Sequence, residues 1–219
     1  MKTYLYFHIG CVGEWEAVFL QLLSLVHSSG LYEKLDKIKC GVLSKTPIPN
    51  LSLDKKIEIV RLHSDLSLYE TITLHALHEQ AEDEDFHVLY LHTKGVTRSN
   101  HPGVADWVKL LAHFTIERHE ECIEGLKDHD AVGVNMANVD GWPVHYSGNF
   151  WWSKASHLRS LKPLVYSCYN APEYWVTSGS GKYLNLWQSH TNHYEQRYPE
   201  SEYKGIPSKP ETINCNKVD

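Results

Sequence analysis

Residues 86–95, Phe-His-Val-Leu-Tyr-Leu-His-Thr-Lys-Gly, are the stretch that decides the fold. Five of the first six residues are apolar, aromatic or β-branched, and the run stops abruptly at His92-Thr93-Lys94-Gly95. Such a run predicts a strand over 86–91 that is buried on both faces, as in a parallel sheet covered by helices. Ligands of open α/β sheets collect at the carboxyl ends of strands, where an imidazole, a hydroxyl and an ammonium suit an anion such as a diphosphate. The alternative is a strand that ends in an ordinary polar turn.

The segments on either side of this strand alternate between strand and helix patterns. From about residue 180 the chain is polar and loses its periodicity, which we interpret as an irregular C-terminal segment over 180–219. The alternation predicts one α/β domain over 1–219, with its core over 3–178: a three-layer sandwich whose central mixed, mostly parallel sheet has about six strands flanked by helices. The expected strands are 3–9, 37–43, 57–62, 86–91, 131–134 and part of 144–152, and the expected helices are 14–28, 66–81, 104–127 and 154–161, with a short element at 172–176.

The bulk composition narrows the class of protein. The chain has 219 residues, a formal net charge of −6 and 42% hydrophobic residues, which argues against a nonspecific nucleic-acid binder. No segment approaches the ~20 apolar residues that a membrane span needs. Five scattered cysteines without CxxC spacing favour reduced thiols, so we expect a cytoplasmic protein.

Two further loops should lie at the same edge of the sheet as residues 92–94. The loop 10–13, Gly-Cys-Val-Gly, joins the first strand to the first helix and suits a base or ribose, because Glu14 at the helix start disfavours a phosphate. The segment 64–71 follows the third strand, and Asp65 or Glu70 could bind ribose hydroxyls. The alternatives are a plain turn for the first loop and helix capping for the second. The candidate nucleotide-binding residues are Gly10, Cys11, Val12, Asp65, Tyr69, Glu70, His92 and Thr93.

The segment 145–152, His-Tyr-Ser-Gly-Asn-Phe-Trp-Trp, mixes small polar residues with large aromatic ones. Hydroxyl and amide groups there could bind sugar hydroxyls, a glycine lets a substrate approach the backbone, and an indole could stack on a pyranose ring. The alternative is that the tryptophans are core residues. The candidate sugar and acceptor residues are His145, Ser147, Gly148, Asn149 and Trp151, the candidate metal ligands are His92 and His145, and the candidate acids or bases are Asp140 and Glu173.

Several of these motifs, taken in order, resemble a known family. They are Tyr90 to Gly95, Asp106-Trp107, Asp130 to Asn135, Ser147 to Trp152 and Glu173 to Trp175. The set resembles small GT-A-type glycosyltransferases of bacteria and large algal DNA viruses, among them the N-terminal domain of a chlorella-virus protein of capsid-glycan synthesis. The resemblance covers about 3–178 and implies a UDP-sugar donor, a glycan or glycoprotein acceptor, and Mn²⁺ or Mg²⁺. It also implies a host cytoplasmic location if the chain is viral.

The chain departs from that family at one point. In GT-A enzymes the strand corresponding to 86–91 usually ends in an Asp-x-Asp metal motif, where this chain has His92-Thr93-Lys94. Either His92 ligates a metal with the help of another acid, or Lys94 neutralises the diphosphate directly. The resemblance places Gly10, Cys11 and Asp65 near the nucleotide, and Ser147 to Asn149 with Trp151 near the donor sugar and acceptor.

These observations lead us to expect a glycosyltransferase. Its catalytic residues would be Lys94, which stabilises the leaving diphosphate, and Glu173 or Asp140, which could act as a base on the acceptor hydroxyl. The missing Asp-x-Asp motif supports an alternative, an inactive nucleotide- or carbohydrate-binding module. A metal-dependent hydrolase that uses the histidines is a third possibility.

Overall fold

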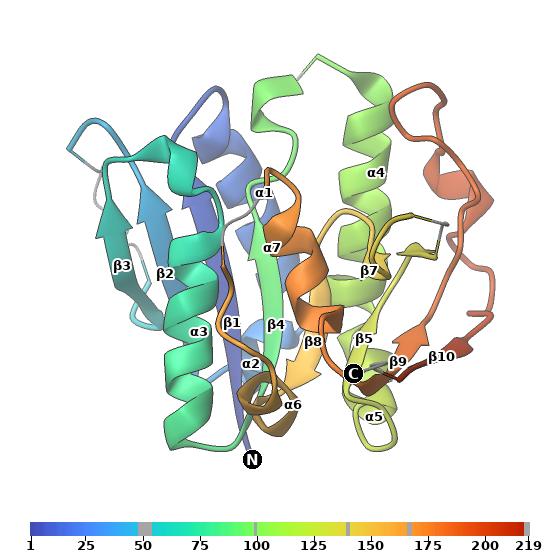
Figure 1. The fold of residues 1–219 in the computed structure, drawn as a ribbon. Helices are drawn as coiled ribbons and strands as arrows, with labels where there is room; N and C mark the ends of the chain where they lie inside the picture. The colour runs from blue at the N-terminus through green and yellow to red at the C-terminus, as the bar shows by residue number, and fades with distance from the viewer. Residues whose placement is uncertain (48–53, 99, 139–140, 166–167, 217–219) are drawn as a thin grey trace.

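The centre of the fold is an eight-stranded sheet (Figure 1). The computed structural model describes residues 1–47, 54–98, 100–138, 141–165 and 168–216. Strands β1 to β4 are mutually parallel, β8 is antiparallel to both its neighbours, β9 is parallel to β5, and β10 is antiparallel to β9. The prediction of a mixed, mostly parallel sheet is confirmed. The sheet has eight strands, where about six were expected. Their order is β10 (Glu211–Cys215), β9 (Gly181–Asn185), β5 (Ala131–Gly133), β8 (Trp151–Lys154), β4 (Phe86–His92), β1 (Lys2–Gly10), β2 (Lys37–Leu43) and β3 (Ile57–His63).

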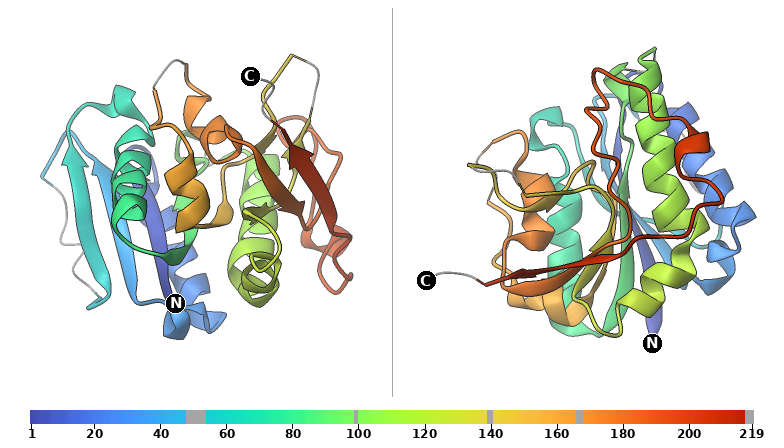
Figure 2. Two further views of the ribbon diagram at one scale, coloured as in Figure 1. Left: turned by 60° about the horizontal axis from the view of Figure 1, so that its bottom comes forward. Right: turned by 90° about the vertical axis from the view of Figure 1, so that its right-hand side faces the viewer.

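Helices cover both faces of this sheet, which Figure 2 shows edge-on in its right-hand view. One face carries α1 (Trp15–Ser28), α4 (Pro102–Ala112) and α5 (His119–Gly125), and the other carries α3 (Thr71–Asp83), α6 (Ala155–Ser160) and α7 (Ala171–Tyr174). The two hydrophobic cores follow this division. Phe7 of β1 packs in the cluster that contains Phe19 of α1, whereas the next residue back, Tyr6, packs in the cluster that contains Leu77 of α3. Alternate side chains of one strand therefore fill opposite cores.

The prediction of a strand buried on both faces is confirmed at β4. Leu89 and Leu91 belong to one core, Val88 and Tyr90 belong to the other, and all four are 0% exposed. The sequence of β4 is continuously apolar because helices cover both sides of it.

The chain changes direction across the sheet at β1, and this opens a crevice. From β1 it passes through α1 and the short α2 (Leu31–Lys34) to β2 on one side, and then returns through α3 to β4 on the other side. The loop after β1 leads to α1, whereas the loop after β3 leads to α3 on the opposite face, so these two loops diverge at the carboxyl ends of the parallel strands. The register pairs His8 with His92 and Gly10 with Leu43, so these four residues meet at one edge.

Three expected elements differ from the structure. The predicted helix 104–127 is α4 and α5, separated by a π-helical stretch over His113–Glu117. The predicted helix 66–81 starts with a separate 3₁₀ turn, η1 (Leu66–Leu68), and α3 begins only at Thr71. The predicted strand 144–152 is two strands: β7 (His145–Tyr146) pairs with β6 (Met136–Ala137) in a small second sheet, and β8 joins the main sheet. Gly148 and Asn149, with φ of 100° and 57°, make the turn that separates them.

The C-terminal segment is more regular than expected. It supplies β9 and β10 at the edge of the sheet, and the chain between them runs along the outside of α4 (Figure 2). There Arg197 forms a two-pronged ion pair with the buried Asp106 of α4. Neither the edge strands nor this ion pair can be predicted from a local sequence pattern, because each depends on a partner far away in the chain.

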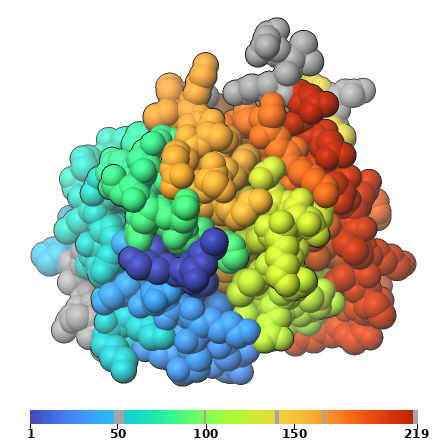
Figure 3. All heavy atoms as spheres, turned by 90° about the horizontal axis from the view of Figure 1, so that it is seen from below, coloured from blue at the N-terminus to red at the C-terminus, as the bar shows by residue number. Residues whose placement is uncertain are grey.

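At the amino ends of β1 and β4, opposite the crevice, packed side chains cover the sheet. Figure 3 looks at this face, where the start of β1 in dark blue lies beside the turn before β4 in green. Lys2 and Glu84 form an ion pair there at 2.7 Å. The acidic run 83–85 therefore lies away from the crevice. Over the described part of the chain, no helix is both long and apolar enough to cross a membrane.

Candidate nucleotide and sugar site

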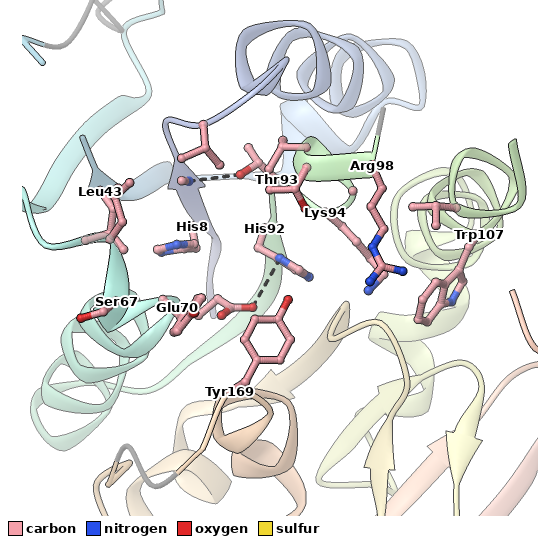
Figure 4. Close-up of a pocket in the computed structure, with 18 of the residues that line it drawn as sticks. His8, Leu43, Ser67, Glu70, His92, Thr93, Lys94, Arg98, Trp107 and Tyr169 are labelled. Atoms are coloured by element: carbon pink, nitrogen blue, oxygen red, sulfur yellow. Dashed lines mark hydrogen bonds and ion pairs between the residues drawn. The ribbon is translucent and has the colours of Figure 1, made fainter. Parts of the chain in front are cut away.

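A cavity of about 530 Å³ lies above the carboxyl ends of β1, β2 and β4 (Figure 4). Its walls come from the three strand ends, from the segment before α3, from the loop after β4, and from two residues that arrive late in the chain. Cavities at this position of an α/β sheet are the usual ligand sites. Its lining residues include His8, Gly10, Val12, Leu43, Ser67, Tyr69, Glu70, His92, Thr93, Lys94, Arg98, Trp107, Tyr169 and Tyr194.

A smaller cavity of about 190 Å³ continues from the first. Its own walls are formed by Ser147, Asn149 and Glu173, with Asn170 and Pro172. The two cavities form one elongated site, because six residues line both of them. These six are Glu70, His92, Lys94, Trp107, Tyr169 and Tyr194.

The end of β4 is fixed by hydrogen bonds to the end of β1. The Thr93 hydroxyl accepts the Gly10 N–H at 3.1 Å, and the Thr93 N–H donates to the His8 carbonyl at 3.0 Å. Gly95, with φ of 82°, then turns the chain sharply into the 3₁₀ turn η2 (Val96–Arg98). This geometry directs Lys94 into the junction of the two cavities.

Two cations meet at that junction. The Lys94 Nζ lies 3.8 Å from the centre of the Trp107 ring, and the Arg98 guanidinium lies 4.6 Å from the centre of the Tyr194 ring. Figure 4 shows both cationic side chains directed toward the same part of the cavity. Burial lowers the pKa of Lys94, attraction to Glu173 and Glu70 raises it, and repulsion from Arg98 lowers it again. The cavity can therefore hold an anion with more than one negative charge.

His92 and Glu70 form a coupled pair beside Lys94. The His92 Nε2 lies 3.1 Å from the Gly148 carbonyl, which can only accept, so this nitrogen carries the proton. The other nitrogen, Nδ1, faces a Glu70 carboxylate oxygen at 3.4 Å. Burial, followed by the charge of Lys94, holds the pKa of His92 well below its usual value. Burial also raises the pKa of Glu70 to about 7, although Lys94 opposes this shift.

The raised pKa of Glu70 predicts a pH-dependent stability. The folded protein holds this proton more tightly than the unfolded chain, whose glutamate has its usual pKa near 4.5, so stability falls as pH rises from about 4.5 through about 7. Each tenfold difference in proton affinity corresponds to about 1.4 kcal/mol, so the ionised carboxylate costs up to ~3 kcal/mol at pH 8. We expect Glu70→Gln to increase the free energy of unfolding at pH 8 by ~1–3 kcal/mol and to change it little at pH 4. Urea unfolding of both proteins at the two pH values measures this; an equal effect at both would contradict the assignment.

Glu173 and Gly148 connect the smaller cavity to this pair. A Glu173 carboxylate oxygen accepts the Gly148 N–H at 2.5 Å, while the Gly148 carbonyl accepts from His92. The two peptide groups that flank the Gly148 Cα are thus both hydrogen-bonded to residues of the site.

The structure brings most of the predicted site residues together. Gly148 joins them through its two hydrogen bonds, although it lines neither cavity. The predicted site residues that line one of the two cavities are Gly10, Val12, Tyr69, Glu70, His92, Thr93, Lys94, Ser147, Asn149 and Glu173.

Besides Gly148, four predicted residues lie outside both cavities. The Asp65 carboxylate caps η1 by accepting from the backbone and hydroxyl of Ser67, at 2.9 and 2.6 Å. Trp151 is 0% exposed, stacks on Tyr90 and belongs to the core, which places it beneath the site and not in it. Cys11 packs against the other core, and His145 contacts the Pro143 carbonyl and the ring of Tyr174. Asp140 lies outside the described residues.

Several residues that line the site were not among the predicted site residues, among them Arg98, Trp107, Tyr169 and Tyr194. Arg98 follows Lys94 by one helical turn, a spacing that could have suggested it. Trp107 was predicted to face inward from its helix and belongs to the Asp106-Trp107 motif of the resemblance, but it was given no role in the site. Tyr169 and Tyr194 are 69% and 48% exposed and come from segments without periodicity, so no pattern predicts their position.

The described residues do not fit a divalent cation at this site. No group of three His, Cys, Asp or Glu side chains converges anywhere in the described part of the chain. At the end of β4 only His92 and Glu70 approach each other, and the Lys94 ammonium lines the same cavities. His145, the other proposed ligand, lines neither cavity. At phosphate sites Mg²⁺ is usually held by one or two carboxylates together with phosphate oxygens and waters. Here the Glu70 carboxylate faces His92 and the Glu173 carboxylate accepts the Gly148 N–H, so neither is directed at an open cation position.

Comparisons with known proteins give a family for the chain. No curated protein matches the sequence. Residues 41–202 match a family described as a domain of unknown function, DUF8361. This match covers well over half of the chain and includes Glu70, the end of β4, Gly148 and Glu173. The protein therefore belongs to the DUF8361 family.

Proposed function

We propose that the protein is a glycosyltransferase of GT-A type that uses a nucleotide-sugar donor, with UDP-sugars as the first candidates. One observation carries the proposal: two connected cavities of unequal size meet at Lys94, and a second cation, Arg98, lines the larger cavity beside this junction. A nucleotide sugar has the matching shape, with a large nucleoside, a charged diphosphate in the middle and a smaller sugar at the far end. The position of the site, at the crevice between β1 and β4, supports the same reading.

In this proposal the larger cavity holds the nucleoside. Gly10 and Val12 allow close approach at the first loop, and Leu43, Ser67 and Tyr69 form the far wall. The smaller cavity holds the sugar, with the polar groups of Ser147, Asn149 and Glu173 available to its hydroxyls. The acceptor, a glycan or glycoprotein hydroxyl, would enter beside the exposed rings of Tyr169 and Tyr194.

The proposed reaction breaks the bond between the anomeric carbon of the sugar and the diphosphate oxygen. The electron pair of that bond leaves with the diphosphate, the acceptor oxygen bonds to the anomeric carbon, and the acceptor proton passes to a base. Lys94 and Arg98 stabilise the charge that grows on the leaving diphosphate, an interaction stronger in the transition state than in the bound substrate. Glu173 and Glu70 are the described carboxylates that line the smaller cavity and are placed to take the proton.

The test is a donor panel. Isothermal titration with UDP is followed by assays of donor hydrolysis and of transfer to simple glycosides, each with and without Mn²⁺. We expect UDP binding and slow hydrolysis of at least one donor. Binding without turnover of any donor would favour a nucleotide-binding module instead.

The assignment of the smaller cavity gives a separate prediction. Ser147→Phe fills that cavity, so we expect affinity for a UDP-sugar to fall by at least ~10-fold while affinity for UDP changes by less than ~2-fold. Titration calorimetry with both ligands measures the difference. Ser156→Phe, on the exposed surface of α6, is the matched control. Equal losses for both ligands would contradict the assignment.

A further inference from the structure

The Lys94 ammonium at the end of β4 is held by a packed aromatic ring. The Lys94 Nζ lies 3.8 Å from the centre of the Trp107 ring, and the His193 ring stacks on the same indole at 5.1 Å. Trp107 and His193 are 5% exposed, so this stack is part of the packed interior. The Lys94 ammonium therefore does not need to be ordered by the ligand, which lowers the entropic cost of binding.

Arg98 extends the positive charge along the cavity. It is close enough to Lys94 to disfavour the lysine's charge, and it rests on the ring of Tyr194. Two cations opposite one ligand suit a diphosphate, because that group carries at least two negative charges and has oxygens on both phosphorus atoms. Arginine adds a planar set of donors that can bind two oxygens at once.

The groups that would have to hold a metal already have protein partners. His92 donates from Nε2 to the Gly148 carbonyl and presents Nδ1 to Glu70. Glu173 accepts the Gly148 N–H. A divalent cation at this point would have to break these contacts and would also lie near the ammonium of Lys94, which repels it.

We infer that Lys94 and Arg98 replace the divalent cation, so that a nucleoside diphosphate binds this site without metal. This inference rests on the proposed function, and it identifies the chemical class that the junction recognises: a diphosphate held by two side-chain cations. It is an alternative to the expectation of bound Mn²⁺ or Mg²⁺, because it assigns the same task to residues of the chain.

The experiment measures UDP binding by titration calorimetry to protein in EDTA, in Mg²⁺ and in Mn²⁺. We expect the dissociation constants to agree within about 3-fold. Lys94→Met should weaken UDP binding at least ~10-fold, with no recovery on addition of either metal, and should leave uridine binding nearly unchanged. Arg98→Gln should give a smaller loss in the same direction. Lys109→Met removes one positive charge from the exposed surface of α4 and is the matched control.

The outcomes separate this inference from the proposed function. If UDP binds only when Mg²⁺ or Mn²⁺ is present, the inference is overturned and the glycosyltransferase proposal survives. If Lys94→Met binds UDP as tightly as the unchanged protein in EDTA, the inference is overturned as well. If no nucleoside diphosphate from a panel of uridine, guanosine, cytidine and adenosine binds under any condition, the proposed function fails and the inference fails with it.

Discussion

Replacement of Lys94 by methionine is expected to lower the rate of sugar transfer by about 10²- to 10³-fold, the usual loss when one charged contact to a transition state is removed. Methionine keeps an unbranched side chain over Trp107, so the packing of the junction changes little while the positive charge disappears. The charge matters most in the transition state, because the diphosphate gains negative charge as the sugar departs.

The measurement is kcat for the donor identified by the panel, or for its hydrolysis, at saturating donor concentration. A larger effect on kcat than on uridine binding separates a role in catalysis from a general disturbance of the cavity. Lys109→Met should transfer sugar at the normal rate. A folded Lys94→Met protein with unchanged kcat would remove Lys94 from the mechanism.

The second large effect is expected at Gly148, which both makes a tightly packed turn and binds two residues of the site. Its φ of 100° is a conformation that residues with a Cβ rarely adopt, and an added Cβ would lie 2.6 Å from the Leu111 Cδ1 and 3.2 Å from the Trp107 Cζ2. Gly148→Ala should therefore destabilise the protein by ~2–4 kcal/mol, through backbone strain and overpacking together. It should also reduce transfer strongly, because the same peptide bonds hold His92 and Glu173.

Gly205→Ala is the control that separates the two causes. Gly205 also has a positive φ, 76°, but nothing lies within 4 Å of the position of an added Cβ. We expect this variant to lose only ~1 kcal/mol, the cost of the backbone conformation alone. Urea unfolding of both variants gives the comparison, and equal stabilities would show that the packing around Gly148 is looser than the structure indicates.

The sequence predicted the part of the fold in which local pattern and tertiary environment agree. The run over 86–91 is apolar because β4 is covered on both faces, so the pattern itself reports the burial. The end of that strand gave Thr93 and Lys94, and the rule that ligands collect at carboxyl ends of strands gave Gly10 and Glu70.

Other elements depend on distant partners, so no local pattern could predict them. The strands β9 and β10 gain their stability from pairing with β5 and with each other, and Tyr194 reaches the site because Arg197 binds Asp106 nearly a hundred residues earlier. Trp151, predicted as a sugar contact, is instead a buried core residue, and here the local environment of the strand is the cause. A tryptophan in a strand covered on both faces packs in a core whichever way it points.

The most direct test of the account is a crystal structure of the protein with UDP, grown in the presence of EDTA. We expect the diphosphate to lie within hydrogen-bond distance of the Lys94 Nζ and the Arg98 guanidinium, with the uridine in the larger cavity and the smaller cavity open for the sugar. A diphosphate bound at any other place, or one that touches neither cation, would contradict it.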